Sequence, residues 1–283
     1  STQTEFWLSV FAGAEAAAPE YNLELTVVGP ETEEDYETQN QMVEEAVRQG
    51  ADAIVFSAID FENNAAAIDS AAQQGVRIVA IDSNVDSDQV STYIGTDNYA
   101  AGQMAAQAAL DQVEGPLNVG IVNYDISSAN GQERERGAAD LFADSGRAEI
   151  VAVINTLAEA GHAQTDTAAL LARYPEINVL VAFNEPTSVG AARAVEEAGR
   201  SEDLFLVGFD SNVLTVDGLQ GIVDAISAGK ATGAVGQSAS GLAESVATLV
   251  KNYQADGDLM SNTGDMIVDE TVAKIRVPYT TVS

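Results

Sequence analysis

The chain of 283 residues contains no cysteine, only one histidine and only one tryptophan. Without cysteine, neither a disulfide framework nor thiolate chemistry is available. This absence does not fix the compartment, because large secreted proteins can rely on their hydrophobic cores alone. No run of about 18 apolar residues occurs either, so the sequence has no segment suited to span a bilayer as a helix.

Basic residues are also scarce, since 12 Lys and Arg face 44 Asp and Glu and the formal net charge is -32. DNA and anionic membranes would be repelled, because both need clustered cations. The densest cluster is Arg134 with Arg136, and it is interleaved with Glu133 and Glu135. Such a surface keeps a protein soluble where salt is concentrated, which favours a hypersaline habitat. An ordinary acidic secreted protein is the alternative, and the sequence does not decide between them.

Hydrophobic residues make up 46 % of the chain, enough to bury substantial cores. Apolar runs alternate with helical patterns along most of the sequence, which predicts parallel sheets built of right-handed βαβ units. The length suits two α/β lobes. The pattern predicts strands at 23–28, 53–56, 78–81, 92–95, 117–123, 149–154, 178–182, 204–209 and 232–237, and helices at 6–18, 32–50, 62–74, from 99, and at 132–145, 163–173, 187–199, 216–228 and 238–254.

One segment of the chain occurs twice in similar form. The run Arg77-Ile78-Val79-Ala80-Ile81-Asp82-Ser83-Asn84-Val85 returns as Leu204-Phe205-Leu206-Val207-Gly208-Phe209-Asp210-Ser211-Asn212-Val213. In each copy an apolar run stops at a carboxylate, as expected where a parallel strand delivers a side chain to the carboxyl edge of its sheet. A ligand held between two such edges would meet both aspartates.

Further short motifs occur in a fixed order along nearly the whole chain. Individually they are weak, but together they are specific. They are Phe6-Trp7-x-x-Val10-x-x-Gly13, Gly50-x-Asp52-x-Ile54, Ile81-Asp82-Ser83, Gly95-Thr96-Asp97-Asn98, Arg134-Glu135-Arg136-Gly137, Phe183-Asn184-Glu185, Val207-Gly208-Phe209-Asp210 and Gly236-Gln237.

With these motifs the chain resembles the periplasmic sugar-binding proteins of the ribose and galactose type, the type I solute receptors of ABC importers. The resemblance implies two doubly wound parallel-sheet lobes that close over a ligand. Three crossover segments would join them, near 97–99, near 236–238 and in the 260s to 270s. The lobes expected are residues 1–97 with 238–268, and residues 98–237 with 269–283.

The function that the resemblance implies is binding of a monosaccharide or related polyol, followed by delivery to an ABC transporter permease. The protein would act as a monomer, in the periplasm or outside the cell. A ligand-sensing domain of a sensor kinase or chemoreceptor system is the alternative. A LacI-type repressor, which shares the architecture, would need a DNA-binding headpiece, and the charge opposes DNA. The sequence does not name the sugar or its affinity.

Sugar hydroxyls both donate and accept, so carboxylates, amides and guanidinium groups in two-pronged arrangements suit them. Asp82 and Asp210 fit the accepting role, although a strand-ending Asp can also be a helix N-cap. The family position of Arg134 donates to ligand oxygens, with a surface ion pair as the alternative. Asn184 and Gln237 would offer paired donors and acceptors.

Aromatic faces stack on sugar rings, and the family uses the positions of Phe6 and Trp7 in this way, with core packing as the alternative. Thr4 and Ser57 match further contact positions. Asp97 and Asn98 are expected to stitch the hinge and cap the helix that follows.

Three features depart from the ribose receptors. This chain has Ser83 where they carry Arg, and Ala158 where they carry an aromatic residue, which weakens a specific ribose assignment. Relatives also have a strand before the loop that precedes Phe6, whereas this chain starts in that loop, so that strand is either removed or not represented in this numbering.

Catalysis has little support in the sequence, and we expect no enzyme activity. His162 follows Gly161 in a predicted loop exposed to solvent, and no G-x-S-x-G elbow, P-loop or dinucleotide fingerprint follows a strand. Asp86-Ser87-Asp88 lacks the remaining ligands of a calcium loop, so neither a metal nor a cofactor is expected.

Overall fold

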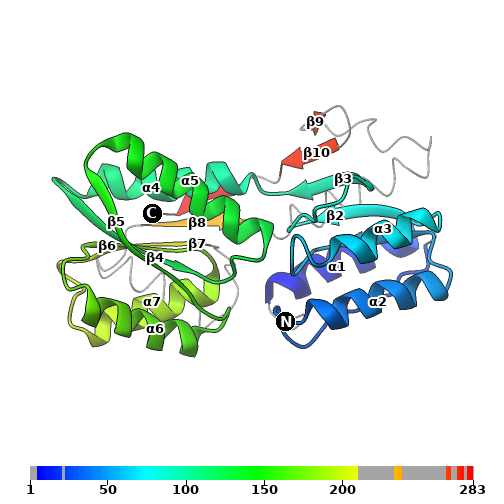
Figure 1. Cartoon of the computed structure of the whole chain (residues 1–283), viewed down its shortest axis with the longest axis horizontal. Coiled ribbons are helices and arrows are strands. Elements are labelled where there is room, and N and C mark those ends of the chain that lie inside the picture. Colours follow the sequence, from blue (N-terminus) through cyan, green and yellow to red (C-terminus); the bar gives the residue numbers. More distant parts are fainter. Residues whose placement is uncertain are drawn as a thin grey trace. The chain divides into compact units, whose positions relative to one another are not determined.

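The computed structural model describes residues 5–20, 23–209, 233–237, 266–268, 273–276 and 279–282. For the four strands beyond residue 232 it describes the backbone pairing only. Contacts divide the chain into two compact units, each built on its own sheet. Unit 1 includes the chain up to Thr96, and unit 2 begins at Asp97 (Figure 1).

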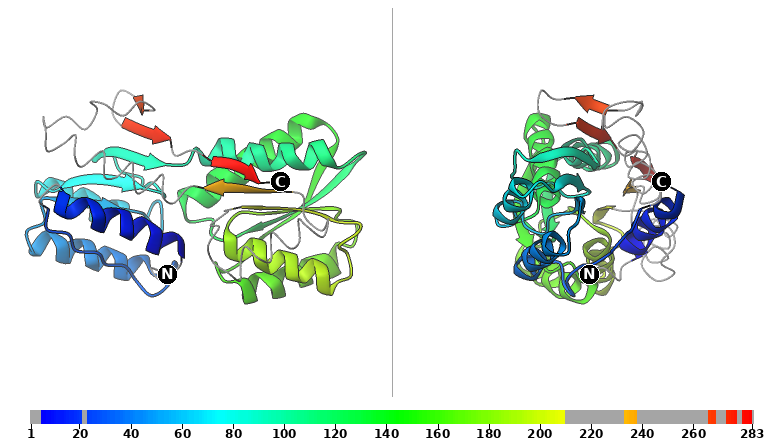
Figure 2. Two further views of the ribbon diagram at one scale, coloured as in Figure 1. Left: turned by 180° about the vertical axis from the view of Figure 1, so that it is seen from behind. Right: turned by 90° about the vertical axis from the view of Figure 1, so that its right-hand side faces the viewer.

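Unit 1 contains a five-stranded sheet in the order β1-β2-β3-β10-β9. The first four strands of this order are parallel, and β9 pairs antiparallel with β10. Turned by 90°, the unit shows helix α1 apart from α2 and α3 (Figure 2). The elements are α1 (Glu5–Glu20), α2 (Tyr36–Arg48), β1 (Ala53–Phe56), α3 (Ala65–Gln73), β2 (Arg77–Ile81), β3 (Val90–Gly95), β9 (Met266–Val268) and β10 (Ala273–Arg276).

The core of unit 1 joins α2 and α3 to the sheet. Val43 of α2 and Ile68 of α3 are buried against Phe56, Ile78 and Ala80 of β1 and β2. Helix α2 begins at Tyr36, four residues later than the sequence predicted. The reason is that Asp35 serves as its N-cap, with Oδ1 accepting from the Thr38 amide at 2.9 Å.

The strand predicted at residues 23–28 is wrong, because the structure has no strand there. Leu23, Leu25, Val27 and Val28 have the apolar content of a strand, but all four are exposed. A strand exists only where a neighbouring backbone completes its ladder of hydrogen bonds. No described strand pairs with this segment, so its β-propensity finds no partner.

Unit 2 contains a six-stranded sheet in the order β11-β8-β7-β6-β4-β5, parallel except for β11. Helices α4 and α5 cover one face and α6 and α7 the other (Figure 1). The elements are α4 (Asn98–Gln112), β4 (Leu117–Asn123), α5 (Ala129–Ser145), β5 (Ala148–Asn155), α6 (Ala160–Arg173), β6 (Val179–Ala182), α7 (Glu185–Glu197), β7 (Phe205–Phe209), β8 (Gly233–Gln237) and β11 (Tyr279–Val282).

Helices α4 and α5 approach each other more closely than side chains would allow. A Cβ on Gly102 of α4 would lie 2.1 Å from the carbonyl oxygen of Arg134 on α5. In return, a Cβ on Gly137 of α5 would lie 2.0 Å from the carbonyl oxygen of Tyr99 on α4. The two glycines therefore set the spacing of the helices and, with it, the position of Arg134.

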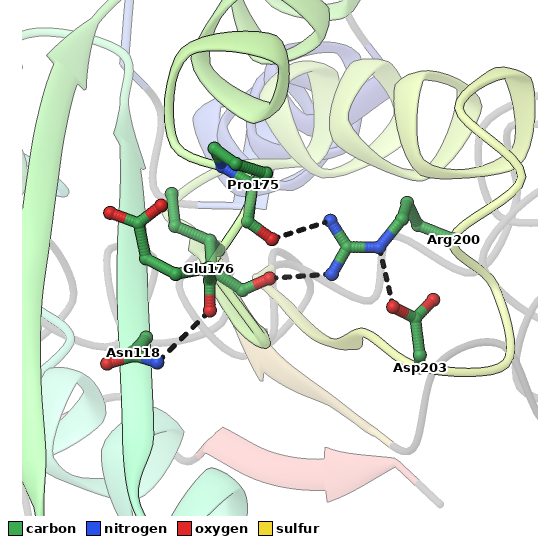
Figure 3. Close-up of polar contacts among 6 residues, drawn as sticks. Asn118, Pro175, Glu176, Arg200 and Asp203 are labelled. Atoms are coloured by element: carbon green, nitrogen blue, oxygen red, sulfur yellow. Dashed lines mark hydrogen bonds and ion pairs between the residues drawn. The ribbon is translucent and has the colours of Figure 1, made fainter.

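A polar cluster holds the turn before β6 in place (Figure 3). Arg200 donates to the carbonyls of Pro175 at 3.4 Å and Ile177 at 2.9 Å, and it pairs with Asp203 at 2.6 Å. Asn118 of β4 donates to the carbonyl of Glu176 at 3.1 Å. These bonds satisfy backbone oxygens at the amino edge of the sheet, opposite to the edge where the strands end.

The chain passes between the units after Thr96, again between β8 and β9, and again between β10 and β11. The fold class expected from the sequence, with two doubly wound parallel-sheet lobes and a three-segment connection, is thus confirmed. Strand β10 pairs in the sheet of unit 1, whereas the expected lobes placed residues 269–283 together in the second. The helices expected at 216–228 and 238–254 lie outside the described residues. Of the helices that are described, none has the length and apolar character needed to cross a membrane.

Candidate functional site

The carboxyl edge of the unit 1 sheet brings together two of the residues singled out in the sequence. Ser57 directly follows β1 and Asp82 directly follows β2, and these strands are parallel neighbours. The hydroxyl of Ser57 donates to Oδ2 of Asp82 at 3.4 Å and accepts from the amide of Ser83 at 3.4 Å. The sheet thus presents a carboxylate and a hydroxyl side by side.

Two further polar atoms follow Asp82 in the loop after β2. Ser83 is 4 % exposed. Its hydroxyl, like the Oδ1 atom of Asn84, has no hydrogen-bond partner in the described part of the chain. A buried polar atom without a partner costs free energy unless water or a ligand satisfies it. The Ser83 hydroxyl and Asn84 Oδ1 could therefore form further hydrogen bonds next to the carboxylate of Asp82.

The two aromatic candidates lie at the start of α1. Trp7 stacks on Phe11, with ring centroids 5.9 Å apart, and its Nε1 donates to Glu33 at 3.3 Å. The indole is half-buried, so part of its surface remains open. Phe6 lies in the same helix, but its side chain is not described. Thr4 lies outside the described residues.

Arg134 lies inside unit 2 and is 3 % exposed. Its Nε donates to Oδ1 of Asn98 at 2.8 Å, and its Nη1 donates to the carbonyl of Phe183 at 2.5 Å. The guanidinium carbon also lies 4.9 Å from the ring centre of Phe209. The alternative of a surface ion pair is therefore wrong. The side chain is a buried cation whose plane is fixed from three sides.

Asn184 follows β6 and begins α7 as its N-cap. Its Oδ1 accepts from the amide of Thr187 at 2.9 Å and from the hydroxyl of Thr187 at 2.7 Å. The cap thus orients the amide and uses only its oxygen.

For the remaining two candidates, Asp210 and Gln237, the structure describes no side chain. Asp210 follows β7 directly but lies outside the described residues. Gln237 is the last residue of β8, where its backbone pairs with Tyr279, and nothing is described of its side chain.

Sequence reasoning missed the residues that hold Arg134 in place. Asn98 was expected to stitch the hinge, yet it is 1 % exposed and its amide oxygen meets the guanidinium. Phe183 directly follows β6 and Phe209 is the last residue of β7, and their rings meet edge to face with centroids 5.4 Å apart. An aromatic residue at the point where each of two neighbouring strands ends was the available signal.

The structure also places other polar residues that the sequence singled out. Asp97 caps α4, with its Oδ1 accepting from the amide of Ala100 at 3.0 Å. Arg136 is exposed and lies over the ring of Tyr99. His162 is exposed beside Glu159, although it lies in α6 rather than in a loop. No group of three or more metal-ligating side chains occurs within the described residues.

Each unit therefore carries polar side chains at the carboxyl edge of its own parallel sheet. A family model for the periplasmic binding protein domain matches residues 1–258. The chain belongs to the periplasmic binding protein family. This membership confirms the resemblance read from the motifs.

Among curated relatives of this periplasmic binding protein, the D-ribose/D-allose-binding protein of Pseudomonas aeruginosa is 26 % identical over 219 residues. The alignment covers 75 % of this chain and 68 % of the relative. The D-allose-binding periplasmic protein of Escherichia coli is 24 % identical over 264 residues, which cover 90 % of this chain and 82 % of that protein.

Solved structures of periplasmic binding proteins share the fold. The periplasmic component of an ABC-type sugar transport system from Hahella chejuensis superimposes with a TM-score of 0.88 at 22 % identity, over 100 % of this chain and 97 % of that one. A carbohydrate transporter solute-binding protein from Agrobacterium radiobacter, in complex with D-arabinose, gives 0.86 at 23 % identity, over 100 % and 91 %. At this identity the likeness establishes the fold.

Proposed function

We propose that this protein is an extracytoplasmic receptor that binds a monosaccharide or a related polyol between its two units and delivers it to an ABC importer. The observation that carries the proposal is the set of polar side chains that each unit presents at the carboxyl edge of its own sheet. Unit 1 offers the carboxylate of Asp82 beside Ser57, and unit 2 offers the buried guanidinium of Arg134 beside the amide of Asn184.

The chemistry of these groups suits neutral polyhydroxyl ligands. A carboxylate accepts from two hydroxyls, while a guanidinium and an amide donate in a planar fork, so alternate hydroxyls of one sugar ring satisfy both sets. Trp7 adds an aromatic face for the C–H side of a ring. The site offers one guanidinium, and this group already donates hydrogen bonds to Asn98 and Phe183. It is therefore poorly suited to bind the phosphate of a phosphorylated sugar.

Family membership supports a receptor that binds and releases without chemical change. The relatives named above are described as sugar-binding or transport components, and they lend no support to the sensory alternative. The family also implies an extracytoplasmic location. The permease partner, action as a monomer and closure of the units over the ligand belong to the proposal.

The test is thermal unfolding against a panel of pentoses, hexoses and polyols in molar salt. A ligand that binds only the folded state at a thousandfold excess over its Kd stabilises that state by about 4 kcal/mol. We expect one class of sugar to raise the Tm by several degrees. Isothermal titration with that sugar then gives the Kd.

Two variants and a control link the shift to the site. Asp82→Asn and Arg134→Lys should each clearly reduce the shift. Asp88→Asn makes the same change at an exposed position after β2 and should retain it. The proposal fails if no sugar or polyol shifts the Tm, or if all three variants keep the full shift.

A further inference from the structure

Asp82 is the one non-glycine residue with a positive φ among the described residues, at φ 55°. A left-handed conformation costs an L-residue about 1–2 kcal/mol, although Asp tolerates it better than most. Such a conformation persists only where the surroundings over-determine it. The strained residue is also the one proposed to accept from the ligand.

Two hydrogen bonds from β3 hold the main chain of Asp82. Its amide donates to the carbonyl of Ile94 at 2.8 Å, and its carbonyl accepts from the hydroxyl of Tyr93 at 2.6 Å. These bonds involve the two peptide groups that flank the Cα atom. Because both peptide planes are held, φ and ψ of Asp82 are held together.

Gly95 gives the phenol of Tyr93 room to make this bond. Residues 93 and 95 lie on the same face of β3, since side chains alternate along a strand. A Cβ on Gly95 would lie 2.0 Å from the hydroxyl oxygen of Tyr93 and 3.0 Å from the carbonyl oxygen of Asp82. The φ of Gly95 is not in the left-handed region, so glycine serves here for space.

The ring of Tyr93 packs against the core cluster between β2 and the helices α2 and α3. Packing limits the rotamers of the ring, so the hydroxyl has a fixed position from which to reach Asp82. The left-handed turn at Asp82 ends the alternation of β2. The φ of this residue therefore sets the direction in which the carboxylate leaves the sheet, toward Ser57.

We propose that Tyr93 is a positioning residue of the binding site: its hydroxyl holds Asp82 in the left-handed conformation, and Gly95 admits the phenol. The inference rests on the proposed function, in which Asp82 accepts from a sugar hydroxyl. It assigns to the Tyr93-Ile94-Gly95 segment a role in affinity, although Tyr93 is not expected to touch the ligand.

The experiment compares Tyr93→Phe with the wild type. This change removes one oxygen and leaves the packed ring in place. We expect the Kd for the sugar identified in the panel to rise about tenfold, as for the loss of one hydrogen bond to an organised site. Gly95→Ala should weaken binding as well, because it displaces the phenol. Tyr174→Phe, at a half-buried tyrosine packed on the core of unit 2, is the matched control and should leave the Kd unchanged.

A double-mutant cycle separates positioning from a general loss of stability. If Tyr93 acts through Asp82, adding Tyr93→Phe to Asp82→Asn should change the Kd by less than about twofold. If Tyr93→Phe instead had a general structural effect, its change in binding free energy would add in full to that of Asp82→Asn. Crystal structures of the ligand-free wild type and Tyr93→Phe proteins give a second readout: we expect φ of residue 82 to leave the left-handed region in the variant.

The outcomes distinguish the inference from the function on which it rests. If the wild type and Tyr93→Phe bind the sugar equally while Asp82→Asn does not, Tyr93 has no positioning role and the function stands. If the wild type binds no member of the panel, the proposed function fails. In that case an unchanged φ in ligand-free Tyr93→Phe overturns the positioning step, and a relaxed φ supports it.

Discussion

Arg134 shows how a single buried residue can be fixed before any ligand arrives. It is held by Asn98 from α4, by the carbonyl of Phe183 directly after β6, and by the ring of Phe209 at the end of β7. Ordering a long cationic side chain costs conformational entropy, about 2 kcal/mol for Arg. Here the side chain is ordered on folding, so this cost would not weaken binding of the ligand that we propose.

We expect Arg134→Lys to weaken sugar binding by at least about tenfold and to lower the Tm by several degrees. An ammonium group is a single point of charge and cannot serve Asn98 and Phe183 in one plane, so a buried acceptor loses its partner. Arg136→Lys, two residues along the same helix and exposed, is the control and should change neither quantity. Titration calorimetry and calorimetric unfolding measure the two effects. Equal behaviour of the two variants would contradict the buried network.

Asp35 provides a prediction about pH. Hydrogen bonds from the side chain and the amide of Thr38 lower the pKa of Asp35 below its ordinary value of 3.8. Because the folded-state pKa is depressed, the charged cap stabilises the protein above the ordinary pKa, and this contribution is lost as the pH falls through the folded-state value.

Asp35→Asn keeps an acceptor at the N-cap but does not titrate. We expect the wild type to have the higher Tm at pH values above the ordinary pKa of an aspartate, because a negative charge favours the helix N-terminus. The difference should disappear as the pH falls well below that value. Unfolding followed by circular dichroism at several pH values measures it, and a difference that stays constant across the range would show that the charge of Asp35 has no role.

At the scale of the element, the sequence predicted most helices and strands because their signals are local. The buried strands of both units are short apolar runs bounded by turn residues, and the helices show apolar faces at helical spacing. Residues 23–28 show the limit of this reasoning. Whether such a run becomes a strand depends on a partner elsewhere in the chain, which a local pattern does not contain.

The spacing of α4 and α5 could not be predicted in the same way. Gly102 and Gly137 lie inside helices, where glycine is unfavourable by about 0.5–1 kcal/mol relative to alanine. The structure explains these glycines, because the backbone of the facing helix lies where a Cβ would be. A tertiary contact thus overrides the local propensity.

We therefore expect Gly102→Ala to destabilise the protein by about 1–3 kcal/mol, the usual cost of overpacking. Sugar affinity should fall too, since the displaced backbone carries Arg134. Gly161→Ala is the matched control, because its new Cβ would meet only Glu159 Oε1, at an ordinary 3.5 Å. That variant should unfold at the wild-type temperature or slightly above it. Denaturant unfolding compares the two, and an unharmed Gly102→Ala would contradict the close approach of the helices.

For the whole molecule, the sequence predicted which residues follow the parallel strands but not the contacts that hold them. Asp82 and Asn184 stand out as polar residues directly after strands or before a helix, and Arg134 as a rare cation in a short basic and acidic motif. The contacts of Tyr93 with Asp82 and of Asn98 with Arg134 join residues that the chain separates by 11 and 36 positions. Such contacts follow from strand order and helix packing, and no spacing in the sequence encodes them.

The net charge of -32 gives a prediction for the whole chain. Mutual repulsion of carboxylates destabilises the compact state, and salt screens it over a Debye length of about 10 Å at 0.1 M and 3 Å at 1 M. We expect the Tm to rise steeply between 0.1 M and 1 M NaCl. A protein adapted to a hypersaline habitat should continue to gain stability in molar salt, whereas an ordinary acidic secreted protein should level off once the screening is complete.

A variant of reduced charge tests whether repulsion is the cause. The exposed residues Glu44, Asp52, Glu114, Glu149 and Glu176 can be changed together to their amides. We expect this variant to have a higher Tm than the wild type at 0.1 M NaCl, because fewer like charges face each other. The two proteins should converge as salt is added, since screening removes the term by which they differ. A variant that is less stable at every salt concentration would show that these carboxylates stabilise the fold through local contacts, and the charge would then have to be explained by solubility alone.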